Sequence, residues 1–301
     1  MIDPPSFRDR PGSIRTHHFP SPFGNWTVSD GDAPIDLVGD VVSLWESKGF
    51  VGNSYERMVP RGHLDLIFNL AGPQALYPDG SMDHPQIFTR AWLSGLFDRP
   101  IHVGPAYRAE IHGTHLVGVS LTPVAARRLF GLDPRELRNT VIPADDLFGG
   151  AAQSIWHRIG EAKQTAARFD IICGFLRGCR MRSIRPMPFS ALWAVGATIA
   201  TGGQIRVGDL CDELSVSRKH LSTLVGNATG MTPKGFSRLQ RFRRAMSALE
   251  HAKGLDFADV ALDLGFSDQS HFINDFRAFS GESPLRFIAA RSSDGESILF
   301  D

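Results

Sequence analysis

The sequence predicts an α+β fold: an N-terminal β-barrel-like or sandwich domain with helices, followed by an all-α domain with two helix-turn-helix motifs. Three observations carry this prediction. The chain has 301 residues, which corresponds to about two domains at about 150 residues each. Short apolar runs separated by Gly and Pro fill its first part. An internal repeat follows residue 186. We expect domains at 1–185 and 186–291 and a tail at 292–301.

The composition is that of an ordinary folded protein, with 42% hydrophobic and 21% charged residues. The 32 Lys and Arg balance the 32 Asp and Glu, so a nucleic-acid partner has to be argued from a local patch. Three cysteines are too few for a disulfide framework or a four-thiolate zinc site. Because no stretch resembles a signal peptide or a membrane span, we expect a cytoplasmic protein without a membrane partner.

The first part of the chain predicts strands and then helices. Residues 64–68 (Leu-Asp-Leu-Ile-Phe) and 116–121 (Leu-Val-Gly-Val-Ser-Leu) are apolar runs that end at turn residues or a proline, as strands of a sandwich or barrel do. From 122 to 185 the apolar spacing is helical, and Thr122-Pro123 is typical of a helix start. The arginine run at 177–185 predicts an exposed linker.

The repeat appears when the last part of the chain is shifted by 51 residues. His220 then falls on His271, Thr229-Gly230 on Ser280-Gly281, and residues 232–233 (Thr-Pro) on 283–284 (Ser-Pro). In each copy a short helix and a tight turn precede a second helix. Ser217 and Ser267 are the predicted N-caps of the second helices, and Gly230 and Gly281 are their predicted stops.

This arrangement is the helix-turn-helix, whose second helix enters the DNA major groove. The alternative is an all-α domain with helical hairpins that does not bind DNA. Residues 214–249 contain seven basic and no acidic side chains, which favours DNA because a phosphate backbone attracts such a segment. The predicted helix at 233–250 would span about 27 Å, so it could hold two recognition helices near one DNA turn apart.

The outward positions of the two second helices are the predicted contacts to DNA. Their types suit base edges, since Arg and Lys pair with guanine, Asn and Gln with adenine, and an apolar group contacts the thymine methyl. The base-reading candidates are Arg218, Lys219, Ser222, Thr223, Asn227, Gln269, Ser270, Ile273 and Asn274. The phosphate-contacting candidates are Lys234, Arg238, Arg241, Arg244 and Arg277.

Residues 260–272 (Val-Ala-Leu-Asp-Leu-Gly-Phe-Ser-Asp-Gln-Ser-His-Phe), with 276–277 (Phe-Arg) and 281–284 (Gly-Glu-Ser-Pro), carry a resemblance to a known family. They resemble the second helix-turn-helix of the AraC/XylS family of bacterial transcription regulators, and the likeness extends over 188–290. It implies a seven-helix domain that binds double-stranded promoter DNA to activate or repress transcription, with RNA polymerase as a partner. The chain departs from the family at Ile273, where a polar or basic side chain is usual, and at Ala278, where a basic side chain is frequent.

The first 180 residues resemble the N-terminal sensing domains of some regulators of this family, through 61–70 (Arg-Gly-His-Leu-Asp-Leu-Ile-Phe-Asn-Leu) and 117–121 (Val-Gly-Val-Ser-Leu). The resemblance implies a β-barrel-like fold used for effector binding or dimerisation. A small-molecule effector would occupy a pocket lined by Phe68, Trp92, Phe97 and Tyr107. Two alternatives remain open: these aromatics are ordinary core, or the domain only forms a homodimer.

An alternative function is a metal-binding β-barrel enzyme domain fused to a DNA-binding domain. His63, Asp65, His102, His112 and His115 are residue types that bind divalent metals. The sequence lacks the His-Glu-x-x-His, Gly-x-Ser-x-Gly and phosphate-loop patterns. This absence favours histidines scattered over loops, some of them hydrogen-bonded. A DNA-repair alkyl transferase fused to such a domain would need a reactive cysteine. The three cysteines fall on predicted helices, which disfavours that enzyme. We therefore expect no enzyme activity, no cofactor and no metal.

Overall fold

A computed structural model describes residues 14–21, 24–49, 55–78, 82–106, 113–182, 186–250, 257–291 and 297–300. Strands dominate up to residue 121. They are β1 (Ile14–Ser21), β2 (Gly24–Asp32), β3 (Val41–Gly49), β4 (Tyr55–Met58), β5 (Leu64–Asn69), β6 (Gln74–Tyr77), β7 (Gln86–Phe88), β8 (Ala91–Ser94), β9 (Ile101–Pro105) and β10 (Thr114–Leu121). A 3-10 helix, Ile35–Leu37, joins β2 to β3. The strands predicted at 64–68 and 116–121 are confirmed as β5 and β10.

The strands form two antiparallel sheets. The larger has the order β1-β2-β3-β10-β5-β8-β11, where β11 is Val141–Pro143, and the smaller has the order β12-β4-β9-β6-β7, where β12 is Ser297–Phe300. Among the described residues neither sheet closes on itself. Of the two predicted forms, the sandwich is therefore confirmed and the closed barrel is not.

The central strands of the larger sheet are buried on both faces, because apolar side chains alternate to opposite sides of a strand. On one face Leu66 and Phe68 of β5 join the main hydrophobic core. On the other face Ile67 and Trp92 pack against Leu76 of the smaller sheet. The second face is thus the inside of the sandwich, and the first is covered by helices.

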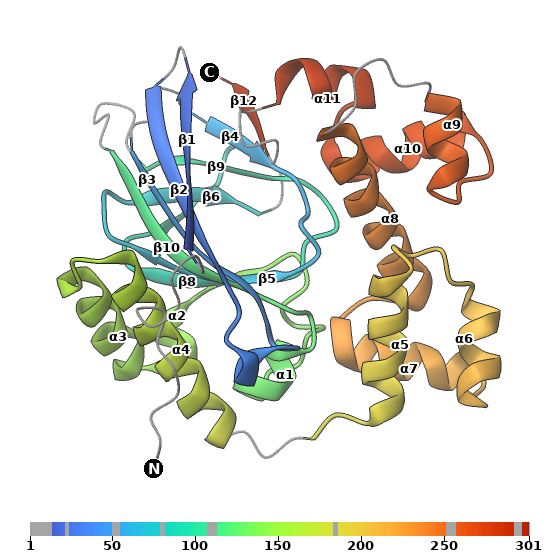
Figure 1. The fold of residues 1–301 in the computed structure, drawn as a ribbon, viewed down its shortest axis with the longest axis horizontal. Helices are drawn as coiled ribbons and strands as arrows, with labels where there is room; N and C mark the ends of the chain where they lie inside the picture. The colour runs from blue at the N-terminus through green and yellow to red at the C-terminus, as the bar shows by residue number, and fades with distance from the viewer. Residues whose placement is uncertain are drawn as a thin grey trace.

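The helices that follow β10 supply that cover, on the side drawn below the sheets in Figure 1. They are α1 (Ala125–Phe130), α2 (Ala144–Phe148), α3 (Gly150–Glu161) and α4 (Thr165–Arg182). The predicted helix start at Thr122 is wrong by two residues, because Val124 is the N-cap of α1 and the Thr122 hydroxyl instead donates to the Gly39 carbonyl at 2.8 Å.

The arginine run predicted as an exposed linker is largely helical. Arg177 lies within α4 and donates two hydrogen bonds, of 2.7 and 3.0 Å, to the Asp36 carboxylate. Arg180 also contacts Asp36. These bonds tie α4 to the β2–β3 connection, and they hold the pKa of Asp36 below its usual range. Arg185, the last arginine of the run, lies outside the described residues.

The C-terminal part is helical. Its helices are α5 (Phe189–Ala200), α6 (Val207–Leu214), α7 (Arg218–Thr229), α8 (Pro233–Glu250), α9 (Phe257–Asp263), α10 (Gln269–Ser280) and α11 (Pro284–Ala290). Figure 1 shows α8 running between the group of α5, α6 and α7 and the group of α9, α10 and α11. The helix predicted at 233–250 is confirmed with those bounds.

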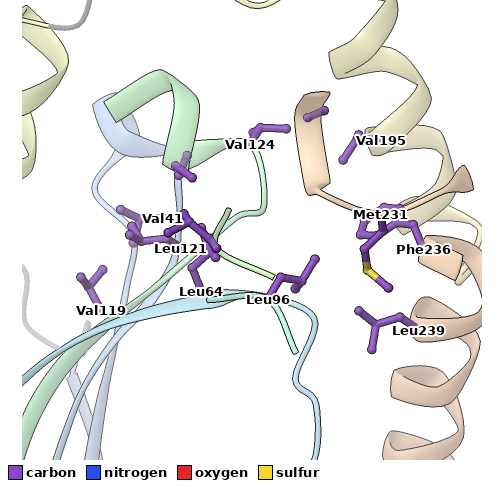
Figure 2. Close-up of a cluster of buried hydrophobic side chains, with 14 of the residues drawn as sticks. Val41, Leu64, Leu96, Val119, Leu121, Val124, Val195, Met231, Phe236 and Leu239 are labelled. Carbon is purple, nitrogen blue, oxygen red and sulfur yellow. The ribbon is translucent and has the colours of Figure 1, made fainter. Parts of the chain in front are cut away.

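One hydrophobic cluster runs through both parts of the chain. Figure 2 shows Leu96 and Val124 of the N-terminal part opposite Val195, Met231 and Phe236 of the helical part. Met231 and Leu96 are each almost wholly buried. The predicted boundary at residue 185 falls within 183–185, outside the described residues, so the division into domains stays a prediction. The described residues on either side of it share a core.

The end of the chain returns to the N-terminal part. β12 pairs antiparallel with β4, with Ser297 opposite Met58 and Ile298 opposite Arg57. Ser297 and Ile298 are buried, and Ile298 belongs to the main core. The predicted tail at 292–301 therefore contains a strand, while 292–296 and 301 lie outside the described residues.

Candidate DNA interface

The first helix-turn-helix consists of α6 and α7. Ser215, in the left-handed conformation at φ 52°, ends α6, and Ser217 caps α7 by accepting a hydrogen bond from the His220 amide at 3.2 Å. The cap is the one predicted, since a serine oxygen satisfies an amide that the first turn leaves free. Leu221 and Val225 are buried, which turns the opposite side of α7 outward.

The second motif consists of α9 and α10, joined through Gly265 at φ 76°. The predicted N-cap Ser267 is wrong: Asp268 caps α10 and accepts from the His271 amide at 2.8 Å. Asp268 lies 51 residues after Ser217, so the repeat keeps its register at the cap. The same hydrogen bond lowers the pKa of Asp268, because it stabilises the carboxylate form.

Both recognition helices end in the same way. Gly230 and Gly281 are left-handed, at φ 76° and 79°, as predicted for the helix stops. The residue before each glycine bears a hydroxyl, and this hydroxyl accepts a hydrogen bond from the backbone amide of the residue that follows the glycine. Thr229 accepts from Met231 at 3.1 Å, and Ser280 accepts from Glu282 at 3.2 Å.

Most predicted base-reading side chains lie on the surface. The exposed ones are Arg218, Lys219, Ser222 and Thr223 on α7 and Gln269, Ser270 and Asn274 on α10. Two of the candidates differ from the rest. Asn227 is only partly exposed, and Ile273 is partly buried against the hydrophobic core. Packing therefore accounts for part of the Ile273 side chain, which the sequence places on an outward face.

The predicted phosphate-contacting residues divide into two groups. Lys234, Arg244 and Arg277 are exposed. Arg238 instead binds the nearly buried carboxylate of Asp275, with Nη2 2.7 Å from Oδ1 and Nε within 3.2 Å of both oxygens. This pairing raises the pKa of Arg238 and ties α8 to α10.

Arg241 also lies between α8 and the second motif. Its guanidinium carbon is 5.1 Å from the centroid of the Phe266 ring, a cation–π distance. Burial lowers the pKa of Arg241, and its Nε has no hydrogen-bond partner within the described residues. Arg238 and Arg241 thus take part in packing the second motif against α8.

The described aromatics predicted to line an effector pocket do not all come together. Phe68 belongs to the main core, whereas Trp92 and Phe97 belong to the cluster inside the sandwich. Tyr107 lies outside the described residues. All three described side chains are buried, and Trp92 Nε1 has no hydrogen-bond partner in this part of the structure. The arrangement favours the alternative that these rings are core.

Of the metal-site candidates that the structure describes, His63 and Asp65 lie near each other, but they do not form one cluster with His102 and His115. His115 bonds Glu46 at 2.7 Å, His102 accepts from Arg57 Nε at 3.2 Å, and His112 is not among the described residues. The described chain contains no group of three His, Cys, Asp or Glu that could hold a metal ion. Burial raises the pKa of Cys173 to about 12, so this thiol is a poor nucleophile.

His63 lies where the β4–β5 connection meets α8. Its Nε2 is 3.5 Å from an Asp65 oxygen, and 11% of its side chain is exposed. Burial is the main cause that lowers the pKa of His63 to about 4, and the charges of Arg61 and Arg243 act in the same direction. His63 is therefore a neutral residue of the contact between the two parts of the chain.

Comparison with known proteins identifies a domain family for the helical part of the chain. Residues 210–290 match the family model of a helix-turn-helix domain, and those residues contain both α7 and α10. The C-terminal part of the chain is an AraC/XylS-type helix-turn-helix domain. The Msm operon regulatory protein of Streptococcus mutans is 31% identical over 86 residues. That alignment covers 29% of this chain and 31% of the relative, so the chain spans about a third of the curated relative it matches.

Two solved structures are similar at low identity. The match to ToxT from Vibrio cholerae covers 92% of this chain and 98% of the ToxT chain, at 10% identity and a TM-score of 0.47. The second is the C-terminal domain of AraT, a response regulator from Geobacillus stearothermophilus. That match covers 36% of this chain and 90% of the AraT domain, at 18% identity and a TM-score of 0.33. The assignment of the AraC/XylS-type domain rests on the match at 210–290.

Proposed function

We propose that the chain is a sequence-specific DNA-binding transcription regulator that recognises promoter DNA through α7 and α10. One observation carries the proposal: two helix-turn-helix units, with caps and stops in the same register, both leave polar side chains exposed on their recognition helices. Such side chains reach base edges in the major groove. The N-terminal part would respond to a small molecule or hold a homodimer, and RNA polymerase would be the partner at the promoter.

The AraC/XylS-type domain and the charge distribution support DNA over an all-α protein without a nucleic-acid partner. Lys234, Arg244 and Arg277 are exposed cations on or next to the helices that would face the duplex. Every helix in the described residues is too short or too polar to cross a bilayer. We propose a cytoplasmic location, which places the chain with its DNA.

The test is a selection from random duplex DNA with the full-length protein, followed by titration of the enriched sequence. Arg218→Ala is expected to weaken specific binding by about 1–3 kcal/mol, because a bidentate contact to guanine is lost. Arg90→Ala, which removes an exposed ion pair with Asp145 in the N-terminal part, is the control and leaves affinity unchanged. A pool without enriched sequences after selection contradicts the proposal.

A second variant tests the phosphate contacts. Arg244→Ala is expected to weaken binding to every sequence alike and to reduce the salt slope by about one ion, because fewer counterions are released. The affinity is measured as a function of salt concentration for specific and unrelated duplexes. An identical salt slope for Arg244→Ala and wild type removes Arg244 from the interface.

A further inference from the structure

The C-terminal ends of both recognition helices lie against the N-terminal part. A methyl group built on Gly230 would overlap the Pro134 carbonyl oxygen, and one built on Gly281 would lie 3.4 Å from Arg57 Nη1. The two glycines are equivalent in the 51-residue repeat. Their helices begin at Arg218 and Gln269, which are exposed. Each recognition helix therefore has one end toward solvent and one end on the N-terminal part.

The residue after each cap glycine is the anchor, and the two anchors differ in chemistry. Met231 follows Gly230 and is 3% exposed within the shared hydrophobic core. Figure 2 shows it on the side of the helical part that faces Leu96 and Val124. Glu282 follows Gly281, and its Oε1 lies 3.3 Å from Arg57 Nη1. The first repeat is thus held by apolar burial and the second by an ion pair.

Arg57 also connects the second anchor to the end of the chain. Its backbone pairs with Ile298 of β12 and its side chain reaches Glu282, while its Nε donates to His102 of the neighbouring strand β9. β4 therefore holds Arg57 between two strands, one of which, β12, comes from beyond α11. The helical part supplies both the ion-pair partner of Arg57 and the strand beside it.

We infer that the N-terminal part sets the relative placement of the two recognition helices by holding α7 through Met231 and α10 through Glu282, Arg57 and β12. Among the described residues α8 is the helix between the two motifs along the chain, and a long helix can curve. Contacts at both far ends restrict this bending. A change in the N-terminal part thus reaches both recognition helices without covering their reading faces. This inference extends the proposed function, because the spacing matters when both helices read one duplex.

The experiment measures the distance between nitroxide labels on Ser222→Cys and Asn274→Cys in the full-length protein without DNA. Both sites are exposed, whereas Cys173, Cys179 and Cys211 are buried. Labelling of protein without the new cysteines measures the signal from the native cysteines. The doubly labelled protein that is otherwise wild type is expected to give one narrow distance distribution. Glu282→Gln removes the charge with little change in shape, and it is expected to broaden that distribution or add a second distance. A chain ending at Arg291, which lacks β12, is expected to do the same.

Asp145→Asn is the matched control, since it removes the carboxylate of the Arg90 ion pair within the N-terminal part and leaves the distribution narrow. Raising salt to about 1 M, where the screening length falls to about 3 Å, is expected to broaden the distribution of the wild type and of Asp145→Asn alike, because both keep the Glu282–Arg57 pair. The same salt is expected to change Glu282→Gln little, because that variant lacks the pair. Unchanged widths in Glu282→Gln and in the truncated chain would mean that α8 alone fixes the spacing, which overturns the inference. Because no DNA is present, this result is independent of the proposed function, which the DNA selection tests.

Discussion

At the residue scale, the side-chain type of the basic residues on α8 does not determine what they do. Arg238, Arg241 and Arg244 follow one another at helical spacing in a segment without acidic residues. The carboxylate that binds Arg238 comes from Asp275, 37 residues further on, and the ring beneath Arg241 comes from α9–α10. Only Arg244 remains exposed. Partners so distant in sequence cannot be predicted from local charge.

Arg238→Ala is expected to lower the free energy of unfolding by about 2 kcal/mol, because it leaves the nearly buried Asp275 carboxylate without its cation. Arg244→Ala removes an exposed cation on the same helix and is expected to change stability by less than about 0.5 kcal/mol. Urea titrations of the two variants give both values. Equal stabilities would show that the Arg238–Asp275 pair does not hold α8 to α10.

His63 makes stability depend on pH. Its pKa in the folded chain is about 4, below the ordinary value of about 6.5, so the unfolded chain binds the proton more readily between these values. Stability is therefore fully present above about pH 6.5 and is lost as the pH falls toward 4.

Relative to His63→Gln, wild type is expected to lose up to about 3 kcal/mol between pH 7 and pH 4. Unfolding measured at several pH values for both chains supplies the difference, in which the titration of the carboxylates cancels. Parallel stability curves would contradict a neutral, buried His63.

At the scale of elements, the sequence predicts those features that neighbouring residues determine, such as the ends of helices. The α8 bounds follow from Pro233 at the first helical position, and the ends of α7 and α10 follow from Gly230 and Gly281, where a left-handed residue is required. The pairing of β12 with β4 depends on a contact across the whole chain, which no local pattern contains. The separation of Phe68 from Trp92 likewise depends on strand register.

Gly230→Ala is expected to cost about 2–4 kcal/mol, since the methyl group is strained at positive φ and also meets the Pro134 carbonyl. Gly131→Ala is the matched control: Gly131 caps α1 at φ 69° with nothing within 4 Å of the added methyl group. The control is expected to cost about 1 kcal/mol, from backbone strain alone. Thermal unfolding compares them, and equal costs would mean that the contact with Pro134 is loose.

At the scale of the whole molecule, a single hydrophobic cluster joins the sandwich, its helices and both helix-turn-helix units. Chains of this length commonly unfold domain by domain. The shared core and β12 make the two parts depend on each other for stability.

Calorimetry of the full-length protein is accordingly expected to show one transition, with equal calorimetric and van't Hoff enthalpies. Met231→Ala, which removes an apolar anchor between the parts, is expected to separate or broaden the transition. Two resolved transitions in the wild-type protein would show that the parts unfold independently.

The unequal attachments of the two repeats have a thermal consequence. Apolar burial weakens on cooling, so Met231 holds the first unit less firmly at low temperature than at physiological temperature. The charged contact of Glu282 lacks that hydrophobic temperature dependence and responds to ionic strength instead. The two contacts therefore weaken under different conditions: cold weakens the Met231 contact and salt weakens the Glu282–Arg57 contact.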